Sequence, residues 1–338
     1  MKNTIIKLVE PKHFAKFENQ LEPGQDEVLV RPEYLSICAA DQRYYSGRRD
    51  KESLEKKLPM ALIHEAWGTV VENAEGLRAG DKVLFVPNIT HEKNDMIGEN
   101  YLYSSQFCAS SRDGFMQKYI VLPRENAVKF ENIDPCVAAV CELFSVAVHS
   151  VETFLSRSHY LRDTIGVWGD GNLGYLTALV LRQKLPESKI TVFGIDPDKL
   201  SKFGFGVQAR NVNSITEADK IDHAFECVGG SITGSVINQI IDLINPEGTI
   251  MLMGVSENFV SLNTRMILEK GLSLIGRSRS GKQDFIETVK MLDWNAPLQN
   301  EIGKIIHTVC EVSGPGDASD AFDSDQKHGF KTVMKCNI

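Results

Sequence analysis

The fold of this chain is decided by residues 165–175, which read Ile165-Gly166-Val167-Trp168-Gly169-Asp170-Gly171-Asn172-Leu173-Gly174-Tyr175. A short β-type segment runs into three glycines spaced G-x-G-x-x-G, and an apolar run typical of a buried helix follows. In such a turn the first glycine permits the sharp bend, the second lets the backbone approach a pyrophosphate, and the third lets the helix pack on the strand. Although glycine-rich turns also occur without a ligand, this strand–turn–helix context predicts a dinucleotide site. Its predicted cofactor-binding residues are Gly169, Gly171, Asn172, Leu173 and Gly174.

Segments of β and α type alternate along the chain beyond this turn. Strands are predicted at 164–168, 189–193, 223–228, 249–255 and 272–276, and helices at 173–182, 199–203, 235–244 and 284–292. Such alternation is typical of a parallel, doubly wound sheet. We therefore predict an α/β protein whose Rossmann dinucleotide-binding domain spans residues 151–294.

The remaining sequence is richer in strand patterns. Strands are predicted at 27–32, 67–72, 82–86 and 116–122, a polar surface loop at 90–112, and a bridging helix at 135–151. From residue 305 onward, strand and loop patterns return. The simplest architecture is a β-rich lobe, made of residues 1–150 and 295–338, that is split around the nucleotide-binding domain.

Composition and charge argue against several classes of protein. The chain has 338 residues and a formal net charge of −8, which argues against a nucleic-acid surface or an anionic membrane as a partner. No stretch approaches the roughly 18 apolar residues of a spanning helix. The seven cysteines contain no C-x-x-C pair and favour a reducing, cytoplasmic setting over a disulfide framework. An anionic substrate would need a local basic cluster.

Four residues of types that bind zinc occur in the β-rich lobe. They are Cys38, His64, Glu65 and Glu142. A catalytic zinc site uses three such ligands and an open or exchangeable fourth position. Each residue also has an ordinary interpretation: a small buried thiol, a hydrogen-bonded core histidine, or an acid on a helix surface. The spacing alone does not decide between the two.

Five motifs in order resemble the zinc-dependent medium-chain dehydrogenase/reductase family over essentially the whole chain. They are Cys38-x-x-Asp41, His64-Glu65, Gly80-Asp81-Lys82-Val83, residues 141–149 (CELFSVAVH) and Gly169-x-Gly171-x-x-Gly174. The segment around Glu142 is similar to the polyol branch of this family. Residues 38–50, 57–61, 223–230 and 254–257 are similar to ribulose-5-phosphate reductases, which make ribitol 5-phosphate for CDP-ribitol, a precursor of teichoic acids and some capsules.

The resemblance implies a GroES-like catalytic domain and one catalytic Zn²⁺. The ligands would be Cys38, His64, Glu65 and Glu142, with Glu65 exchangeable for water or a substrate oxygen. A structural zinc is not expected, because residues 86–114 contain only Cys108 where alcohol dehydrogenases carry four cysteines. Those enzymes also relay the alcohol proton through Ser or Thr at the position of Ala40, so another route is needed here, for which Asp41 is one candidate.

The resemblance also implies a phosphorylated substrate and a coenzyme. Arginine matches phosphate bidentately, so Arg43, Arg48 and Arg279 are candidate phosphate ligands, with a solvated charge as the alternative for each. An acid about 20 residues beyond the glycines would indicate NAD(H), and Asp196 has that spacing. Alignment on the following Asp198-Lys199-Leu200 instead places Gly194 there, which leaves room for a 2′-phosphate. We therefore favour NADP(H), with NAD(H) as the alternative.

The predicted function is NADPH-dependent reduction of D-ribulose 5-phosphate to D-ribitol 5-phosphate. Two alternatives remain at this point: an NAD-dependent dehydrogenase of an unphosphorylated pentitol, and a non-catalytic nucleotide-binding relative. A homodimer or homotetramer is expected from the resemblance, and so is a functional association with a ribitol-5-phosphate cytidylyltransferase.

Overall fold

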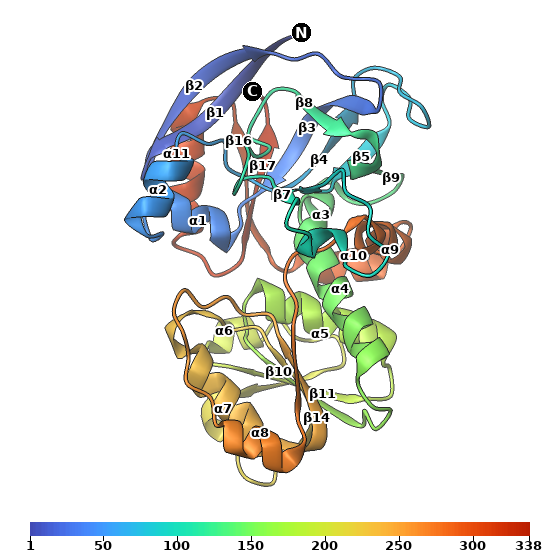
Figure 1. Ribbon diagram of the computed structural model, residues 1–338, viewed down its shortest axis with the longest axis vertical. Helices are drawn as coiled ribbons and strands as arrows, with labels where there is room; N and C mark the ends of the chain where they lie inside the picture. The colour runs from blue at the N-terminus through green and yellow to red at the C-terminus, as the bar shows by residue number, and fades with distance from the viewer. The chain divides into compact units, whose positions relative to one another are not determined.

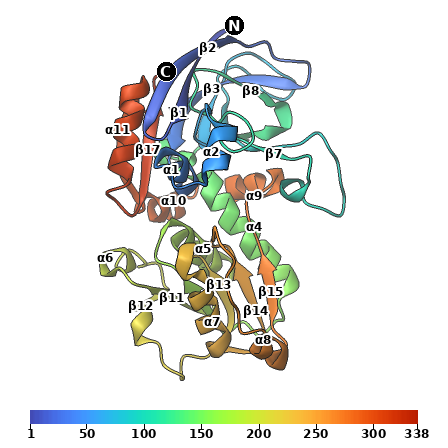
Figure 2. The same ribbon diagram turned by 60° about the vertical axis from the view of Figure 1, so that its left-hand side comes forward.

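Two large β-sheets organise the chain in the computed structural model, which describes residues 1–338 (Figures 1 and 2). Each sheet belongs to its own compact unit. The first unit comprises Met1–Ser145 and Arg279–Ile338, and the second comprises Val146–Ser278. None of the helices combines the length and the apolar character needed to cross a membrane.

The second unit is the predicted doubly wound α/β domain. Its strands are β10 (Thr164–Trp168), β11 (Lys189–Gly194), β12 (Gln208–Asn211), β13 (Ile221–Glu226), β14 (Ile244–Leu252) and β15 (Ser273–Gly276). Its helices are α5 (Asn172–Lys184), α6 (Pro197–Leu200), α7 (Thr233–Leu243) and α8 (Thr264–Lys270). All strand pairs are parallel, in the order β12-β11-β10-β13-β14-β15. The order reverses beside β10, so the glycine-rich turn lies at the switch point where such sheets bind nucleotides.

The first unit is the β-rich lobe. Its strands are β1 (Lys2–Glu10), β2 (His13–Gln20), β3 (Glu27–Ser36), β4 (Glu65–Val70), β5 (Lys82–Phe85), β6 (Asn88–Ile89), β7 (Gln106–Phe107), β8 (Ile120–Pro123), β9 (Ala127–Phe130), β16 (Ile306–Val312) and β17 (Lys331–Cys336). Its helices are α1 (Ala39–Tyr45), α2 (Lys51–Lys57), α3 (Pro135–Ala139), α9 (Lys282–Leu292), α10 (Ala296–Gly303) and α11 (Pro315–Asp325). Helix α4 (Cys141–Arg157) runs from this unit into the next. The sheet order β16-β17-β3-β4-β5-β9 confirms that the C-terminal tail rejoins the first lobe.

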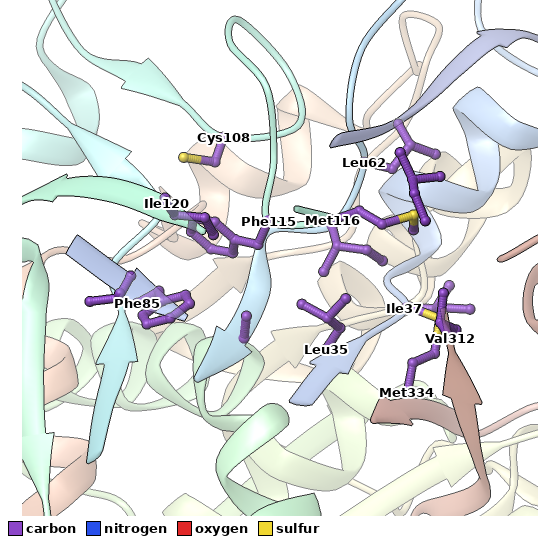
Figure 3. Close-up of a cluster of buried hydrophobic side chains, with 14 of the residues drawn as sticks. Leu35, Ile37, Leu62, Phe85, Cys108, Phe115, Met116, Ile120, Val312 and Met334 are labelled. Atoms are coloured by element: carbon purple, nitrogen blue, oxygen red, sulfur yellow. The ribbon is translucent and has the colours of Figure 1, made fainter. Parts of the chain in front are cut away.

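An apolar cluster assembled from distant segments fills the first unit (Figure 3). Leu35 on β3, Phe85 on β5 and Met334 on β17 are all buried in it. Burying each large apolar side chain contributes roughly 1.5–3 kcal/mol. Ile37 and Ile63 belong to the same cluster and directly precede two of the predicted metal ligands. The core therefore fixes the backbone from which those ligands project.

The structure differs from the predicted domain limits and from several predicted elements. The units divide at 145/146 and 278/279, whereas the sequence analysis placed the limits at 150/151 and 294/295. Helices α9 and α10 pack against β9 and α3 of the first unit, which moves the second limit forward. The tail, predicted as strand and loop, contains helix α11, and neither β12 nor α8 was predicted. Short elements of this kind owe their conformation to tertiary packing rather than to local pattern.

His223 on β13 makes the stability of the second unit pH-dependent. Its Nδ1 accepts the Thr249 N–H at 3.0 Å, and its Nε2 donates to the Leu161 carbonyl at 3.0 Å, so the ring is held neutral. Burial, aided by the neighbouring His159, lowers the pKa of His223 from 6.5 to about 4, against the opposing effect of Asp222. Because an unfolded histidine takes up a proton at higher pH than this one, the contribution of His223 to stability is complete above pH 6.5 and is lost as the pH falls toward 4.

We expect urea unfolding at pH 7 and pH 5 to show a smaller stability loss in His223→Gln than in the wild type. The difference in free energy of unfolding between the two pH values is taken within each protein. It therefore reports the titration of His223 and not the hydrogen bonds that the substitution removes at both pH values. His13→Gln, at an exposed position, is the matched control and should keep the wild-type pH dependence. An equal loss in all three proteins would contradict the prediction.

Candidate metal and dinucleotide sites

Three metal-binding side chains gather in the first unit, at Cys38, His64 and Glu65. Their ligand atoms, a sulfur, a ring nitrogen and a carboxylate oxygen, all lie within 4.8 Å of one another. Antiparallel pairing of β3 with β4 sets Ser36 opposite Glu65, and Cys38 follows β3 as the N-cap of α1. Ile63 adopts a positive φ of 75°, a strained conformation for a β-branched residue of the kind found at functional sites. Strand register and this backbone bend thus bring the three predicted ligands together.

Asp41 on α1 holds two of these residues in position. Its Oδ1 accepts the Ile63 N–H at 3.0 Å and lies 3.6 Å from Nδ1 of His64, while Oδ2 accepts the Cys38 N–H at 3.2 Å. Burial works to lower the pKa of His64, but Asp41 and Cys38 outweigh it and raise the pKa well above its usual range. Asp41 is fully buried, and its contacts give it an orienting role, while the proton route considered from the sequence stays a prediction.

Lys331 on β17 pairs with Glu65 inside the core. Its Nζ donates to both carboxylate oxygens, at 2.5 and 2.6 Å, and to the Ile37 carbonyl at 3.2 Å. The two side chains are 2% and 0% exposed. Burial alone would lower the pKa of Lys331, but Glu65 reverses the effect and raises it. The sequence analysis did not identify Lys331, because no local pattern connects it to a residue 266 positions away.

Glu142 is the second residue of α4, and its carboxylate interacts electrostatically with His64 and Glu65 of the cluster. It is 5% exposed and lies outside the 4.8 Å group. Burial raises its pKa to about 7; His64 opposes the rise, and Glu65 adds to it. The surroundings therefore combine thiol, imidazole and carboxylate donors in a buried space that disfavours further negative charge. This donor chemistry fits a bound divalent zinc ion, which the four residues would hold.

Arg279 is the predicted phosphate ligand that the structure places beside this cluster. Its guanidinium lies 4.6 Å from the ring centroid of Phe107, and that ring lies 5.2 Å from the ring of His64. The side chain forms no hydrogen bond or ion pair within the chain. Burial lowers its pKa, and Glu142 partly offsets the shift. A half-buried guanidinium that stacks on a ring but has no hydrogen-bond or ion-pair partner is suited to an anionic ligand.

A pair of serines fixes the backbone next to Arg279. Ser280 and Ser145 are both buried, and their hydroxyl oxygens lie 2.7 Å apart. The Ser145 hydroxyl also donates to the Glu142 carbonyl at 2.6 Å. Arg279 itself has a positive φ of 60°, which is uncommon outside glycine. The serine pair thus links the backbone next to Arg279 to the first turn of α4.

The other predicted phosphate ligands are placed differently. Arg48 is exposed and donates from Nε to the Ser46 hydroxyl at 2.7 Å, as a solvated charge does, while Arg43 is half-buried on α1. A basic group that sequence reasoning missed is Lys57, whose Nζ donates to the Tyr44 hydroxyl at 2.9 Å. Lys57 lies in a motif quoted above for its family resemblance, but nothing in that motif indicated a contact with Tyr44.

The glycine-rich turn of the second unit has the geometry that the motif predicts. A Cβ on Gly174 would lie 1.9 Å from the Gly169 carbonyl oxygen, so helix α5 can pack this closely only with glycine there. Gly169 has a positive φ of 125°. Gly171 is the N-cap of α5, and a Cβ on it would meet nothing within 4 Å. The turn is tight on its inner side and open at the helix N-terminus, where a pyrophosphate binds.

Three further side chains are relevant to dinucleotide binding. Oδ1 of Asn172, at the first position of α5, is buried and has no hydrogen-bond partner, as expected where a ligand is to supply one. Leu173 follows it in the same first turn. Asp196 is the N-cap of α6, and its Oδ1 accepts the N–H groups of Asp198 at 2.9 Å and Lys199 at 3.2 Å. One oxygen of the acid with the expected spacing therefore caps α6, and Gly194 ends β11.

Comparison with known proteins agrees with this arrangement. Residues 24–132 match the alcohol dehydrogenase GroES-like domain, and residues 207–294 match the zinc-binding dehydrogenase domain. Ribulose-5-phosphate reductase 1 of Staphylococcus aureus is 46% identical over 99% of both chains, and ribulose-5-phosphate reductase of Bacillus spizizenii is 44% identical over 100% of both. A crystal structure of S. aureus TarJ in complex with NADPH has a TM-score of 0.88 at 42% identity, with both chains fully covered. The chain therefore belongs to the zinc-dependent medium-chain dehydrogenase/reductase family, among the ribulose-5-phosphate reductases.

Proposed function

We propose that this chain reduces D-ribulose 5-phosphate to D-ribitol 5-phosphate with NADPH as the hydride donor. The observation that carries the proposal is the end-to-end similarity, at 40–46% identity, to four ribulose-5-phosphate reductases. The NADPH bound to S. aureus TarJ supports the coenzyme. Within this chain, the Cys38–His64–Glu65 cluster and the unpaired Arg279 beside it support a carbonyl substrate that carries an anion.

The side chains of the first unit would have separate roles in binding the metal and the substrate. Cys38, His64 and Glu142 would hold Zn²⁺, with Glu65 as an exchangeable ligand that Lys331 orients through two hydrogen bonds. When bound, Zn²⁺ supplies Lewis-acid polarisation of the C2 carbonyl. Asp41 fixes the His64 ring and the Cys38 backbone, so the donor atoms need little rearrangement. Arg279 would bind the substrate phosphate and thereby orient the sugar.

The test is oxidation of NADPH with D-ribulose 5-phosphate, measured beside D-ribulose and D-xylulose 5-phosphate. Rapid turnover with ribulose 5-phosphate alone is the expected result. Oxidation of free ribitol or arabinitol with NAD, and no activity on phosphorylated sugars, would instead identify a polyol dehydrogenase.

Removal of the metal provides a separate prediction. The protein purified without chelators should contain about one zinc per chain by elemental analysis, as the single donor cluster requires. Dialysis against a chelator should abolish turnover, and added Zn²⁺ should restore it, whereas NADPH binding by fluorescence should persist because its predicted site lies in the other unit. A metal-free protein without turnover would favour the non-catalytic alternative.

The predicted cellular setting also belongs to this proposal. The product would serve a ribitol-5-phosphate cytidylyltransferase in making CDP-ribitol for teichoic acid or capsule, with this chain acting as a homodimer or homotetramer. All seven cysteines are free, which supports the predicted cytoplasmic location.

A further inference from the structure

Asp170, inside the glycine-rich turn, holds the end of the neighbouring strand. Its Oδ2 accepts the N–H groups of Ile195 at 2.7 Å and Asp196 at 2.8 Å, the two residues that follow β11. This carboxylate also lies against Gly194, since a Cβ built on that glycine would come within 2.5 Å of Oδ2. An acid from the first strand's turn therefore fills the space that a side chain at the end of the second strand would occupy.

The end of the second strand is where a dinucleotide domain contacts the adenosine ribose. In NAD-binding domains an acid there hydrogen-bonds the ribose 2′-hydroxyl, and in NADP-binding domains a basic residue accommodates the 2′-phosphate. Here Gly194 provides no side chain and Asp196 caps α6. We infer that Asp170 is a coenzyme-discriminating residue of this chain, whose carboxylate beside Gly194 moderates the preference for NADPH over NADH. The inference rests on the proposed function, because it assumes that this turn binds a nicotinamide dinucleotide.

The free oxygen of Asp170 favours a hydroxyl over a phosphate. Oδ1 accepts no hydrogen bond within the chain, and an ionised carboxylate offers only acceptor sites. It can therefore accept from a 2′-hydroxyl, whereas it repels a 2′-phosphate. Oδ2 adds a second effect, since it occupies two backbone N–H groups that could otherwise bind that phosphate.

The nearest strand offers one cation, Arg210, that could offset the repulsion between Asp170 and a 2′-phosphate. On β12, which pairs with β11, Arg210 lies opposite Phe193. Its guanidinium forms an ion pair with Asp219 through both terminal nitrogens. The basic side chain that the neighbouring strand could offer is thus already engaged by Asp219, so it does not neutralise the charge of Asp170.

The experiment is to titrate the zinc-loaded protein with NADPH and with NADH and to record the fluorescence of each reduced coenzyme. Asp170→Asn removes the charge but keeps a carbonyl oxygen for the two N–H groups, so the turn should be preserved. We expect the ratio of the NADH Kd to the NADPH Kd to rise about tenfold. Asp170→Ser also frees the two N–H groups and should raise the ratio at least as far.

Asp198→Asn is the matched control. It removes one negative charge from the same region, at an exposed residue on α6, and should change the ratio less than twofold. Equal ratios in the wild type and both Asp170 variants would overturn the inference while leaving the proposed function intact. If the wild type bound neither NADPH nor NADH, both the inference and the proposed function would be overturned.

Discussion

Replacing Lys331 with methionine is expected to lower the free energy of unfolding by about 3–5 kcal/mol. The substitution keeps an apolar chain of similar length in the core but leaves the carboxylate of Glu65, which is 0% exposed, without its cation. Both oxygens of Glu65 lose their hydrogen bonds from Nζ. An unpaired buried charge is among the few changes that destabilise a protein this strongly. Urea unfolding of chelator-treated protein measures the effect without a contribution from bound metal.

Lys335→Met on the same strand is the control for this experiment. Lys335 pairs with Glu311 at 3.4 Å, but the two side chains are 46% and 67% exposed. Solvent screens such a pair, so the substitution should change stability by about 1 kcal/mol or less. The double variant Glu65→Gln/Lys331→Met, in which neither position of the pair is charged, should recover part of the lost stability. A Lys331→Met protein as stable as Lys335→Met would show that the buried pair does not have the proposed role.

Replacing Arg279 with methionine should reduce kcat/KM for D-ribulose 5-phosphate by about 10²-fold. A charge-assisted hydrogen bond to an anion contributes about 1.5–3 kcal/mol, which corresponds to one to two factors of ten for each bond lost. Methionine retains apolar contact with Phe107, whose ring lies 4.6 Å from the guanidinium, so packing beside His64 should be preserved. The kcat/KM for unphosphorylated D-ribulose should change much less. Steady-state kinetics of the wild type and the variant on both sugars measure the two changes.

Arg48→Met is the control that distinguishes specific phosphate binding by Arg279 from a general effect of positive charge on the phosphorylated sugar. Arg48 is exposed and hydrogen-bonded to Ser46, so its loss should alter kcat/KM for the phosphorylated sugar by less than about twofold, as expected for a screened surface charge. If Arg48→Met and Arg279→Met caused the same loss, or if Arg279→Met impaired both sugars equally, Arg279 would not be the phosphate ligand.

The parts of the molecule that the sequence predicts well are those specified by local pattern. Gly169, Gly171 and Gly174 act within a span of a few residues, and the motif predicted both the tight side and the open side of their turn. The alternating segments that follow predicted the parallel sheet, because βαβ connection is a property of neighbouring elements. The ligand set of Cys38 and His64 came from resemblance, since spacing alone left ordinary interpretations open.

The parts that sequence reasoning missed depend on contacts between distant segments. Lys331 matters only because β17 returns beside β3, and nothing near residue 331 indicates a buried partner. Asp170 was quoted as part of the motif, but its role depends on where β11 ends. The second domain limit was misplaced because α9 resembles any amphipathic helix in sequence, and only its packing against β9 assigns it to the first unit.

The hydrogen bond between Ser145 and Ser280 has a consequence for how the chain is assembled. The chain leaves the first unit after Ser145 and re-enters it at Arg279. The serine pair therefore joins the two points where the chain passes between the units. The nucleotide-binding unit is in this sense an insertion whose ends meet at one place, a geometry that proteins tolerate well. A short linker across that point would leave the sheet, its apolar core and the metal-binding residues on a continuous polypeptide. The dinucleotide module could then be removed or exchanged as a unit.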